Sequence, residues 1–314
     1  MRKFLYLLIV VLMTIVHLSP VINQDNVKAE TQSTENILYV GGDGAGNYTN
    51  IQDALYVAKN KDTVYVYSGI YYENIKIRKS INLIGEDKEN TIIDARGIGD
   101  CIFVNACDVC ISGFTIKNTT TGQGIYVQSL LHDAERIRIL GNIIKECYYG
   151  IELYHSRNNK ILGNKIHDNF IGINLDATDS SIIAKNNISN NNISIMLYFS
   201  MGNSIKKHRN EIYENNIRNS HFGIFVSKCW FRLDEIHSNN FINNTFSAYF
   251  LNCMSKWHDN FWDDKRDFLT VYLIAGNYSL CKVPKLWFWW VQMDCNPACE
   301  PYEIDIDSWK DKEG

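Results

Sequence analysis

A short unit of the type Gly-Ile-x-aliphatic recurs along the chain and restricts its fold more than any other feature. The copies read GIYV, GIEL, GINL, SIML, GIFV and SAYF, and they begin at Gly124, Gly150, Gly172, Ser194, Gly223 and Ser247. In each copy two apolar residues alternate with another residue, as in a strand that buries one face. Units that start 22 to 29 residues apart are typical of a solenoid in which each repeat forms one coil.

An asparagine stands at a fixed distance before five of these units. The asparagines are Asn142, Asn164, Asn186, Asn215 and Asn239, each eight residues before the start of the next unit. The offset is constant although the loops between the repeats vary in length. Stacked coils lie about 4.8 Å apart. We therefore predict an internal ladder in which each asparagine amide bonds the amide of the next coil.

Both ends of the repeat region carry segments that suit caps. Residues 49–60 place Ile51, Ala54, Leu55 and Ala58 at helical spacing, with Thr49 or Asn50 as the N-cap. A short helix there would close the open end of the solenoid and protect its edge. At the other end, residues 285–292 read KLWFWWVQ. We expect this aromatic segment to cover the last coil.

The first residues predict export. Arg2 and Lys3 precede an apolar run that is shorter than the roughly 20 residues of a membrane-spanning helix, and a small residue, Ala29, follows. We therefore interpret residues 1–29 as a signal peptide and expect a secreted or cell-surface protein that has no membrane contact apart from this segment. The net charge of −4 offers no basic surface for nucleic acid.

Longer stretches of the sequence resemble one known family. Residues 48–87, YTNIQDALYVAKNKDTVYVYSGIYYENIKIRKSINLIGED, are similar to the opening of secreted NosD-like proteins, whose repeats are carbohydrate-binding and sugar-hydrolase β-helix repeats. NFWDD and MDCNPACEPYEI, which begin at Asn260 and Met293, resemble the end of that family. Where the family has Trp-His, this chain has Cys295-Asn296. The resemblance implies a right-handed parallel β-helix over nearly the whole exported chain.

The expected fold is all-β. We predict a single-stranded right-handed parallel β-helix solenoid with a short N-terminal cap helix and an aromatic C-terminal cap. The expected division of the chain is a signal peptide (1–29), the β-helix (30–262) and a C-terminal capping segment (263–314).

Clear catalytic residues are missing from the sequence. Polygalacturonase-like enzymes, which have a β-helix fold, place their acids immediately before the Gly-Ile strand. In this chain the corresponding pairs are Tyr148-Tyr149, Phe170-Ile171, Asn192-Ile193, His221-Phe222 and Thr245-Phe246, without a carboxylate. The GxYxEN stretch that begins at Gly69 resembles pectin methylesterases, but their aspartate-phenylalanine and arginine-proline-tryptophan motifs are missing. We therefore assign no catalytic residue.

One outer face of the predicted solenoid nevertheless collects acids and aromatic rings. The repeat register puts these side chains on adjacent coils: Glu152, Tyr154, Arg157, Asp176, Asp179 and Tyr198. Aromatic rings beside carboxylates suit sugars, which combine apolar C–H faces with hydroxyl groups. The alternative is a solvated outer face with an ordinary Arg157–Asp179 ion pair.

These observations favour an exported, non-enzymatic surface or extracellular protein that binds a polysaccharide or cell-surface glycan. One alternative is a polysaccharide lyase, hydrolase or epimerase. The family resemblance implies a second, a copper-maturation factor of the periplasmic type. Soft ligands for copper are Met201 and Met254, beside Cys229 and Cys253. We assign no metal ligand and no cofactor.

Two cysteines occupy equivalent places in consecutive repeats. Cys229 and Cys253 each lie six residues after the first position of their unit, at Gly223 and Ser247. Stacking of the two coils would put their Cα atoms about 5 Å apart, within the range of a disulfide. We therefore predict a Cys229–Cys253 bond.

Overall fold

The computed structural model describes residues 35–129, 134–198, 209–227, 234–251, 255–263, 272–279, 287–294 and 297–310. Residues 35–314 form one compact unit. The predicted signal peptide lies outside the described residues, and so do Cys229, Cys253, Met201 and Met254.

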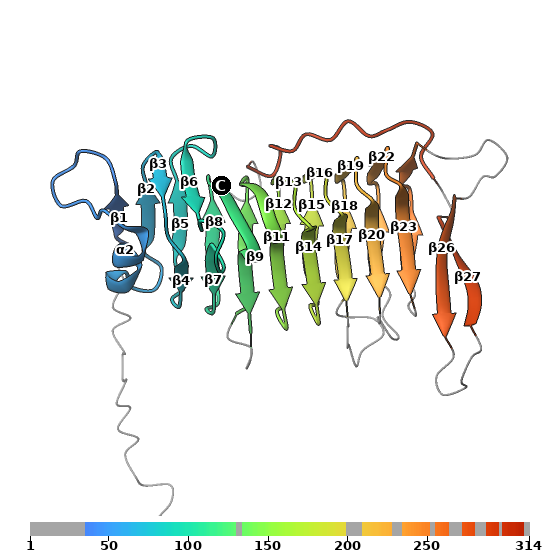
Figure 1. The fold of residues 1–314 in the computed structure, drawn as a ribbon, viewed down its shortest axis with the longest axis horizontal. Helices are drawn as coiled ribbons and strands as arrows, with labels where there is room; N and C mark the ends of the chain where they lie inside the picture. The colour runs from blue at the N-terminus through green and yellow to red at the C-terminus, as the bar shows by residue number, and fades with distance from the viewer. Residues whose placement is uncertain are drawn as a thin grey trace, which may run out of the picture. The chain divides into compact units, whose positions relative to one another are not determined.

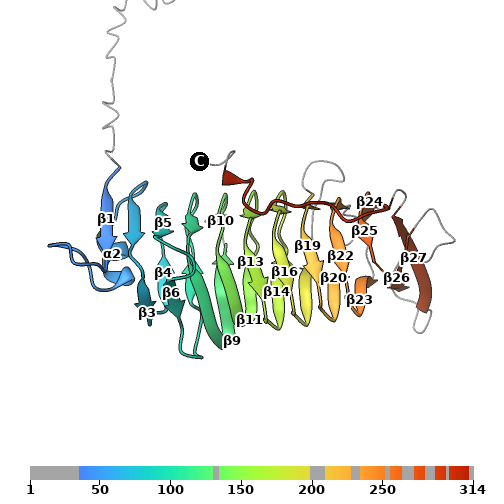
Figure 2. The same ribbon diagram turned by 90° about the horizontal axis from the view of Figure 1, so that it is seen from above.

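The described chain is a parallel β-solenoid, as predicted, whose strands stack in three columns (Figures 1 and 2). The first column contains β1 (Ile37–Val40), β2 (Thr63–Val66), β5 (Asn82–Gly85), β8 (Cys110–Ser112), β10 (Arg138–Leu140), β12 (Lys160–Leu162), β15 (Ile182–Ala184), β18 (Glu211–Tyr213), β21 (Glu235–His237) and β24 (Lys256–His258). Each strand pairs in parallel with the strand of the next coil.

The second column has the same parallel stacking. It contains β3 (Gly69–Tyr71), β6 (Thr91–Asp94), the first halves of β9 (Thr115–Gln128) and β11 (Ile143–Tyr154), β13 (Lys165–His167), β16 (Asn187–Ser189), β19 (Asn216–Arg218), β22 (Asn240–Ile242) and β25 (Phe261–Trp262).

The third column contains the Gly-Ile units. It is built from β4 (Ile75–Ile77), β7 (Ile102–Val104), the second halves of β9 and β11, β14 (Ile171–Asp176), β17 (Ile193–Tyr198), β20 (Phe222–Ser227), β23 (Phe246–Leu251) and β26 (Tyr272–Ser279). In β14 the side chains of Ile173 and Leu175 are buried, as the alternation predicts. Burial of such aliphatic side chains inside the coils stabilises the solenoid.

The predicted asparagine ladder is present and longer than expected. Asn142, Asn164, Asn186, Asn215 and Asn239 are buried, and each donates its backbone N–H and side-chain amide to the next carbonyl oxygen of the row. The row continues to Asn260 and ends at Asp294. There the carboxylate accepts bonds from Asn260 and from the Trp262 indole N–H.

Two further polar rows run along the other corners of the coil, and the sequence did not reveal them. One row contains Asn169, Asn191, Ser220 and Asn244, and the other contains Asn159, Ser181, Asn210 and Asp234. In both, a side-chain oxygen accepts the backbone N–H of the equivalent residue on the preceding coil. The mixture of asparagine, serine and aspartate hides the repeat, although all three residue types supply the same acceptor.

The N-terminal helix α2 (Ile51–Val57) buries Ile51, Ala54 and Leu55 against the first coils. Asn50 is its N-cap residue, one of the two that the sequence predicts, but its side chain makes no capping bond. Instead, the Glu73 carboxylate accepts hydrogen bonds from the N–H groups of Ile51 and Gln52 at 2.8 and 2.9 Å. No helix among the described residues is long and apolar enough to span a membrane.

The C-terminal part does more than close the last coil. Strand β27 (Trp287–Asp294) pairs with β26 in antiparallel fashion and with β24 in parallel. Residues 297–310, which we call the strap, then return along the outside of the solenoid (Figure 2). Tyr302 exchanges hydrogen bonds with Asn240, and Ser308 bonds Lys185.

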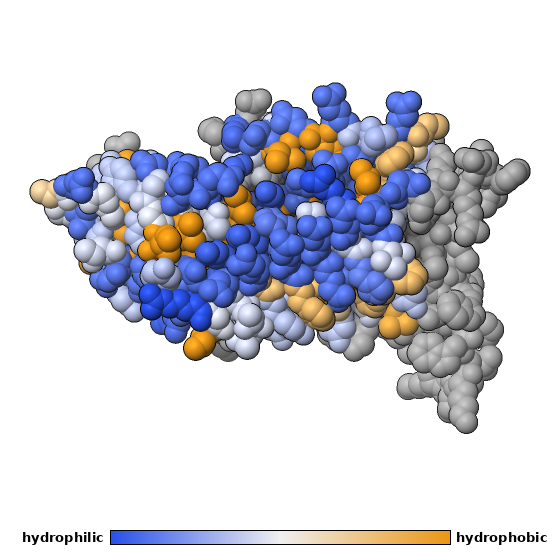
Figure 3. Space-filling model, turned by 45° about the horizontal axis from the view of Figure 1, so that its top comes forward, coloured by the Kyte–Doolittle hydropathy of each residue, from blue (hydrophilic) through white to orange (hydrophobic). Residues whose placement is uncertain are grey.

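The strap ends on an apolar stripe of the outer surface. Trp309 packs against Leu140, Leu162 and Ala184, which lie on successive coils. The stripe needs a glycine beneath the ring, because a Cβ atom on Gly163 would lie 1.8 Å from the Trp309 indole nitrogen. The face shown in Figure 3 is mostly hydrophilic, with apolar side chains in separate patches. By placing Trp309 on Leu140, Leu162 and Ala184, the strap covers an apolar stripe that would otherwise be exposed to water.

We expect Asn186→Ala to lower the free energy of unfolding by at least about 3 kcal/mol. The substitution leaves several buried donors and acceptors on neighbouring coils without partners, at about 1–3 kcal/mol each. Asn192→Ala is the matched control, because Asn192 is an exposed asparagine of the same coil. Urea unfolding followed by circular dichroism measures both. Equal stability of the two variants would contradict a stabilising ladder.

Candidate functional site

The third column presents two rows of side chains to the outside. The first row contains Lys76, Phe103, Tyr126, Glu152, Asn174, Met196, Phe225 and Tyr249. The second contains Gln128, Tyr154, Asp176, Tyr198, Ser227 and Leu251. The backbone register thus puts Glu152, Tyr154, Asp176 and Tyr198 on one face, at the positions that the repeat predicts.

Glu152 is the most enclosed acid of this face, with 9% of its surface exposed. Its two carboxylate oxygens are held from opposite sides, by the Gln123 side-chain amide at 2.6 Å and the Asn174 side-chain amide at 3.0 Å. Burial raises the pKa of Glu152 above its ordinary value, with smaller contributions from Asp176 and Asp100, and the two amide bonds offset only part of this. The site therefore holds a carboxylate that takes up a proton unusually readily.

Asp100 and Gln123 complete this cluster, and neither was predicted from the sequence. Asp100 accepts a hydrogen bond from the Gln123 backbone N–H at 3.0 Å, while the Gln123 side chain bonds Glu152. Because Ile102 pairs with Ile125, Asp100 stands immediately before the first position of its repeat. The unit there reads CIFV, with cysteine in place of glycine, and a search for worn copies could have found it.

Two tyrosines border Glu152. Burial, followed by the nearby charge of Glu152, raises the pKa of Tyr126 to about 12 and raises the pKa of Tyr149. Both phenols therefore remain protonated at neutral pH. A protonated phenol can donate a hydrogen bond, and its ring offers an apolar face.

Further rings extend the aromatic surface along the solenoid. The Phe103 and Tyr126 rings lie 5.6 Å apart, and the stacked pair Phe225–Tyr249 has the same separation farther along the column. Tyr148 and Phe170 stack at 4.9 Å beside the site, and both are exposed. The face thus alternates rings with polar groups.

Arg157 and Asp179 occupy the turn after these strands, as predicted, and their backbones pair. The ion pair is different from the expected one. The Arg157 guanidinium contacts Glu135 on the preceding coil at 2.7 Å, not Asp179. Glu135 is buried, so this contact neutralises an acid that would otherwise be costly to desolvate. Arg157 is therefore engaged within the scaffold.

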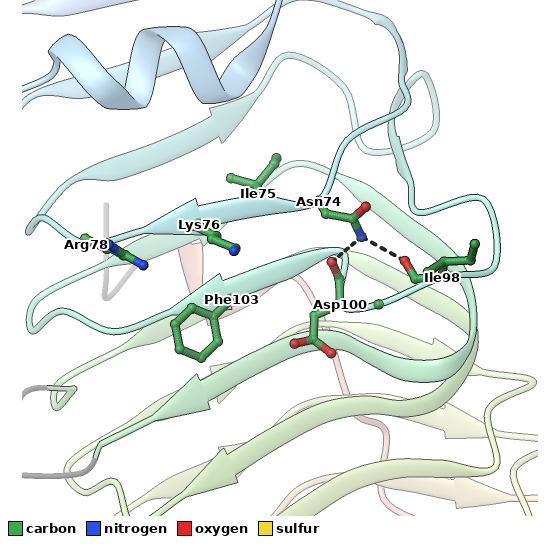
Figure 4. A pocket seen from close by; sticks show the side chains of 8 residues that line it. Asn74, Ile75, Lys76, Arg78, Ile98, Asp100 and Phe103 are labelled. Carbon is green, nitrogen blue, oxygen red and sulfur yellow. Dashed lines mark hydrogen bonds between the residues drawn. The ribbon is translucent and has the colours of Figure 1, made fainter.

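An open pocket of about 410 Å³ adjoins the site at its N-terminal side (Figure 4). Its lining residues are Asn74, Ile75, Lys76, Arg78, Ile98, Gly99, Asp100 and Phe103. The Asn74 side chain donates to the carbonyl oxygens of Ile98 and Asp100 at 2.9 and 2.7 Å, which fixes one edge of the pocket. Asp100 and Phe103 connect this pocket to the Glu152 cluster.

The stretch that resembles pectin methylesterases has a structural role here. Glu73 caps helix α2, Asn74 fixes the pocket edge, and the Tyr71 hydroxyl donates to the Tyr67 carbonyl oxygen at 2.8 Å. These contacts explain the GxYxEN pattern without any catalytic step.

The chain is thus a parallel β-solenoid protein with an acidic and aromatic outer face. It belongs to the NosD family, because the family model described as "Periplasmic copper-binding protein (NosD)" matches residues 55–279. The resemblance seen in the sequence is therefore confirmed.

The family description names copper, a metal that proteins hold through clustered side chains. No group of three or more His, Cys, Asp or Glu side chains is placed to hold a metal ion in the described part of the chain. The sulfur ligands suggested by the sequence, Met201, Met254, Cys229 and Cys253, lie outside the described residues.

A pectin methylesterase shares the fold. The pectin methylesterase PemA from Erwinia chrysanthemi superimposes with a TM-score of 0.53 at 11% identity, over 71% of this chain and 90% of that one. The mannuronan C-5 epimerase AlgE4 A-module from Azotobacter vinelandii has a TM-score of 0.45 at 12% identity, over 67% and 72%. At such identities the likeness shows the fold alone.

One sequence relative is similar over a short stretch. The probable pectinesterase/pectinesterase inhibitor 39 from Arabidopsis thaliana is 35% identical over 80 residues, which are 23% of this chain. The match spans only 15% of that protein's length.

We expect the Glu152 carboxyl to titrate above its ordinary value near 4.5. Folding raises the pKa of Glu152. The free energy of unfolding of wild type therefore gains most, relative to Glu152→Gln, at pH values below the pKa of Glu152 in the unfolded state. This advantage is lost as pH rises through the folded-state pKa, and each tenfold difference in proton affinity between the two states contributes about 1.4 kcal/mol to it. Carbon-13 NMR titration and unfolding across pH measure the two quantities. A carboxyl that titrates at or below 4.5 would refute the expectation.

Proposed function

We propose that this protein is an exported, non-enzymatic glycan-binding β-solenoid whose ligand lies along the outer face of the third column. The observation that carries the proposal is the Glu152 carboxylate, held between the amides of Gln123 and Asn174 and bordered by Tyr126 and Tyr149. Its fixed position makes it a preorganised acceptor for hydroxyl groups.

The arrangement suits a sugar for two reasons. Sugar hydroxyls donate hydrogen bonds to carboxylates, of which Asp100, Glu152 and Asp176 lie on neighbouring coils. The apolar C–H faces of the sugar rings pack on aromatic rings such as Tyr126 and Tyr154. Because the coils repeat along the solenoid, the face offers similar contacts to successive units of an extended polysaccharide.

Export is the second part of the proposal. The basic and apolar start of the sequence has the pattern of a signal peptide. The family description also names a periplasmic protein. Both observations support a location outside the cytoplasm, where polysaccharides are accessible.

A second candidate function is a polysaccharide lyase, hydrolase or epimerase, and one observation favours it. Glu152 has a raised pKa in a polar cluster, as general acids do, and Gln123 links it to a second carboxylate, Asp100. Two carboxyl groups on a sugar-facing surface are the basic equipment of glycoside hydrolysis. The scaffold role remains the first proposal, because none of the six units from Gly124 to Ser247 has a carboxylate immediately before it, although Asp100 stands at that place on the preceding coil.

We expect Asp176→Ala and Tyr154→Ala each to weaken glycan binding about tenfold, equivalent to about 1.4 kcal/mol. Each removes one polar or aromatic contact of the face. Tyr56→Ala is the control, since Tyr56 is 72% exposed on helix α2, away from the site. A glycan screen of the wild type followed by calorimetry measures the effect. Binding that is unchanged in both variants, or no binding by wild type, would reject the proposal.

The two candidate functions are separated by prolonged incubation of the protein with uronate polymers and neutral polysaccharides. The scaffold proposal predicts neither new reducing ends nor unsaturated products that absorb ultraviolet light. Products formed by wild type and lost in Glu152→Gln would instead establish the second candidate.

A further inference from the structure

The pocket beside the Glu152 cluster differs from the rest of the face in its charge. Lys76 and Arg78 come from β4 and the residue after it, and both side chains are exposed. Asp100 is the acidic residue among those that line the pocket. It is also engaged with the neighbouring coil, where it accepts the Gln123 N–H.

These two cations are not used by the described part of the protein. Arg136, Arg157 and Lys256 all form ion pairs with carboxylates on neighbouring coils. Within the described residues, neither the Lys76 ammonium nor the Arg78 guanidinium forms an ion pair. Two unpaired cations at the rim of a pocket produce a local positive potential that attracts an anion.

The pocket is in line with the proposed glycan site. Lys76 pairs with Phe103, Phe103 with Tyr126, and Tyr126 with Glu152 on the next coil. Three inter-coil steps of roughly 4.8 Å place the positive pocket about 14 Å from the Glu152 row. The tilted Phe103–Tyr126 ring pair fills the distance between them. A ligand can therefore contact the cations, the rings and the carboxylate in that order.

We propose that this pocket is an anionic subsite, in which Lys76 and Arg78 hold the carboxylate or sulfate of an acidic sugar unit. The inference rests on the proposed glycan-binding function and adds the charge and direction of the ligand. Guanidinium groups bind such anions through paired N–H bonds, and an ammonium adds a mobile charge.

The acids beyond the Phe103 and Tyr126 rings determine which end of the bound oligosaccharide lies at the cations. Glu152 and Asp176 would repel a second anion placed next to Glu152, whereas Asp100 lines the pocket itself and accepts the Gln123 N–H. The unit at Glu152 is therefore a neutral, hydroxyl-rich sugar, and the acidic unit lies at Lys76 and Arg78. A chain bound in reverse would bring its anion against the carboxylates and leave the cations without a partner.

The test compares two short galacturonate oligosaccharides by calorimetry at several salt concentrations. One is methyl-esterified except for a single free carboxylate at an end, and the other is fully methyl-esterified and neutral. We expect wild type to bind the first at least tenfold more tightly than the second. The preference should shrink as salt rises, because the contact is between exposed charges. The double variant Lys76→Gln/Arg78→Gln should lose the preference and keep the neutral binding.

The matched control is Lys165→Gln/Arg218→Gln, which removes the same charges from exposed positions of the second column. It should keep the preference. A sulfated oligosaccharide is the third probe, and a preference for it that the Lys76/Arg78 variant also abolishes would identify sulfate as an accepted anion.

The outcomes distinguish the two proposals. Equal binding of acidic and neutral oligosaccharides by wild type, or a preference that survives in Lys76→Gln/Arg78→Gln, overturns the subsite and leaves glycan binding in place. No binding of these oligosaccharides by wild type overturns the subsite, and no binding in the glycan screen as well overturns the proposed function. Unchanged thermal unfolding of the double variant shows that a lost preference does not arise from misfolding.

Discussion

The hydrogen bonding between equivalent residues of successive coils is the constraint on which the rest of the structure depends. At each corner, a buried side-chain oxygen accepts the backbone N–H of the coil before it, as Asn164 does for Asn142. A buried polar group without a partner is costly, so each coil is stable only when the next one is in register. The last asparagine, Asn260, needs an acceptor as well, and Asp294 supplies it.

The outer face that we propose to bind a glycan is a consequence of this register. Because the coils cannot shift by a residue without breaking the polar rows, the outward side chains also stand in rows. Lys76, Phe103, Tyr126 and Glu152 are far apart in the sequence, yet they form one continuous line. Along this line the side chains change from positive through aromatic to acidic. A rigid solenoid can present such a series of side chains to an extended polymer without a conformational change.

Local sequence patterns predicted the regular parts of the molecule. The Gly-Ile units located the strands of the third column, and residues such as Ile173 and Leu175 are buried as their alternation requires. The same pattern placed Glu152 beside Asn174 and Tyr154 beside Asp176. It could not predict that Arg157 pairs with Glu135. Glu135 and Asp179 lie on the two coils next to Arg157, and only side-chain geometry decides which of them forms the ion pair.

The sequence by itself thus determined the coil, its core and the order of the outward residues, since these follow from a period that each repeat carries. Only the tertiary structure decided which irregular residues join the site. Asp100 precedes the worn unit CIFV, and its bond to Gln123 exists only because two coils stack. Glu73 lies on a later coil than helix α2 and caps it. The strap returns to place Trp309 over Gly163. These contacts join segments of unequal separation, so they depend on how the coils stack and on where the chain returns, which no local pattern encodes.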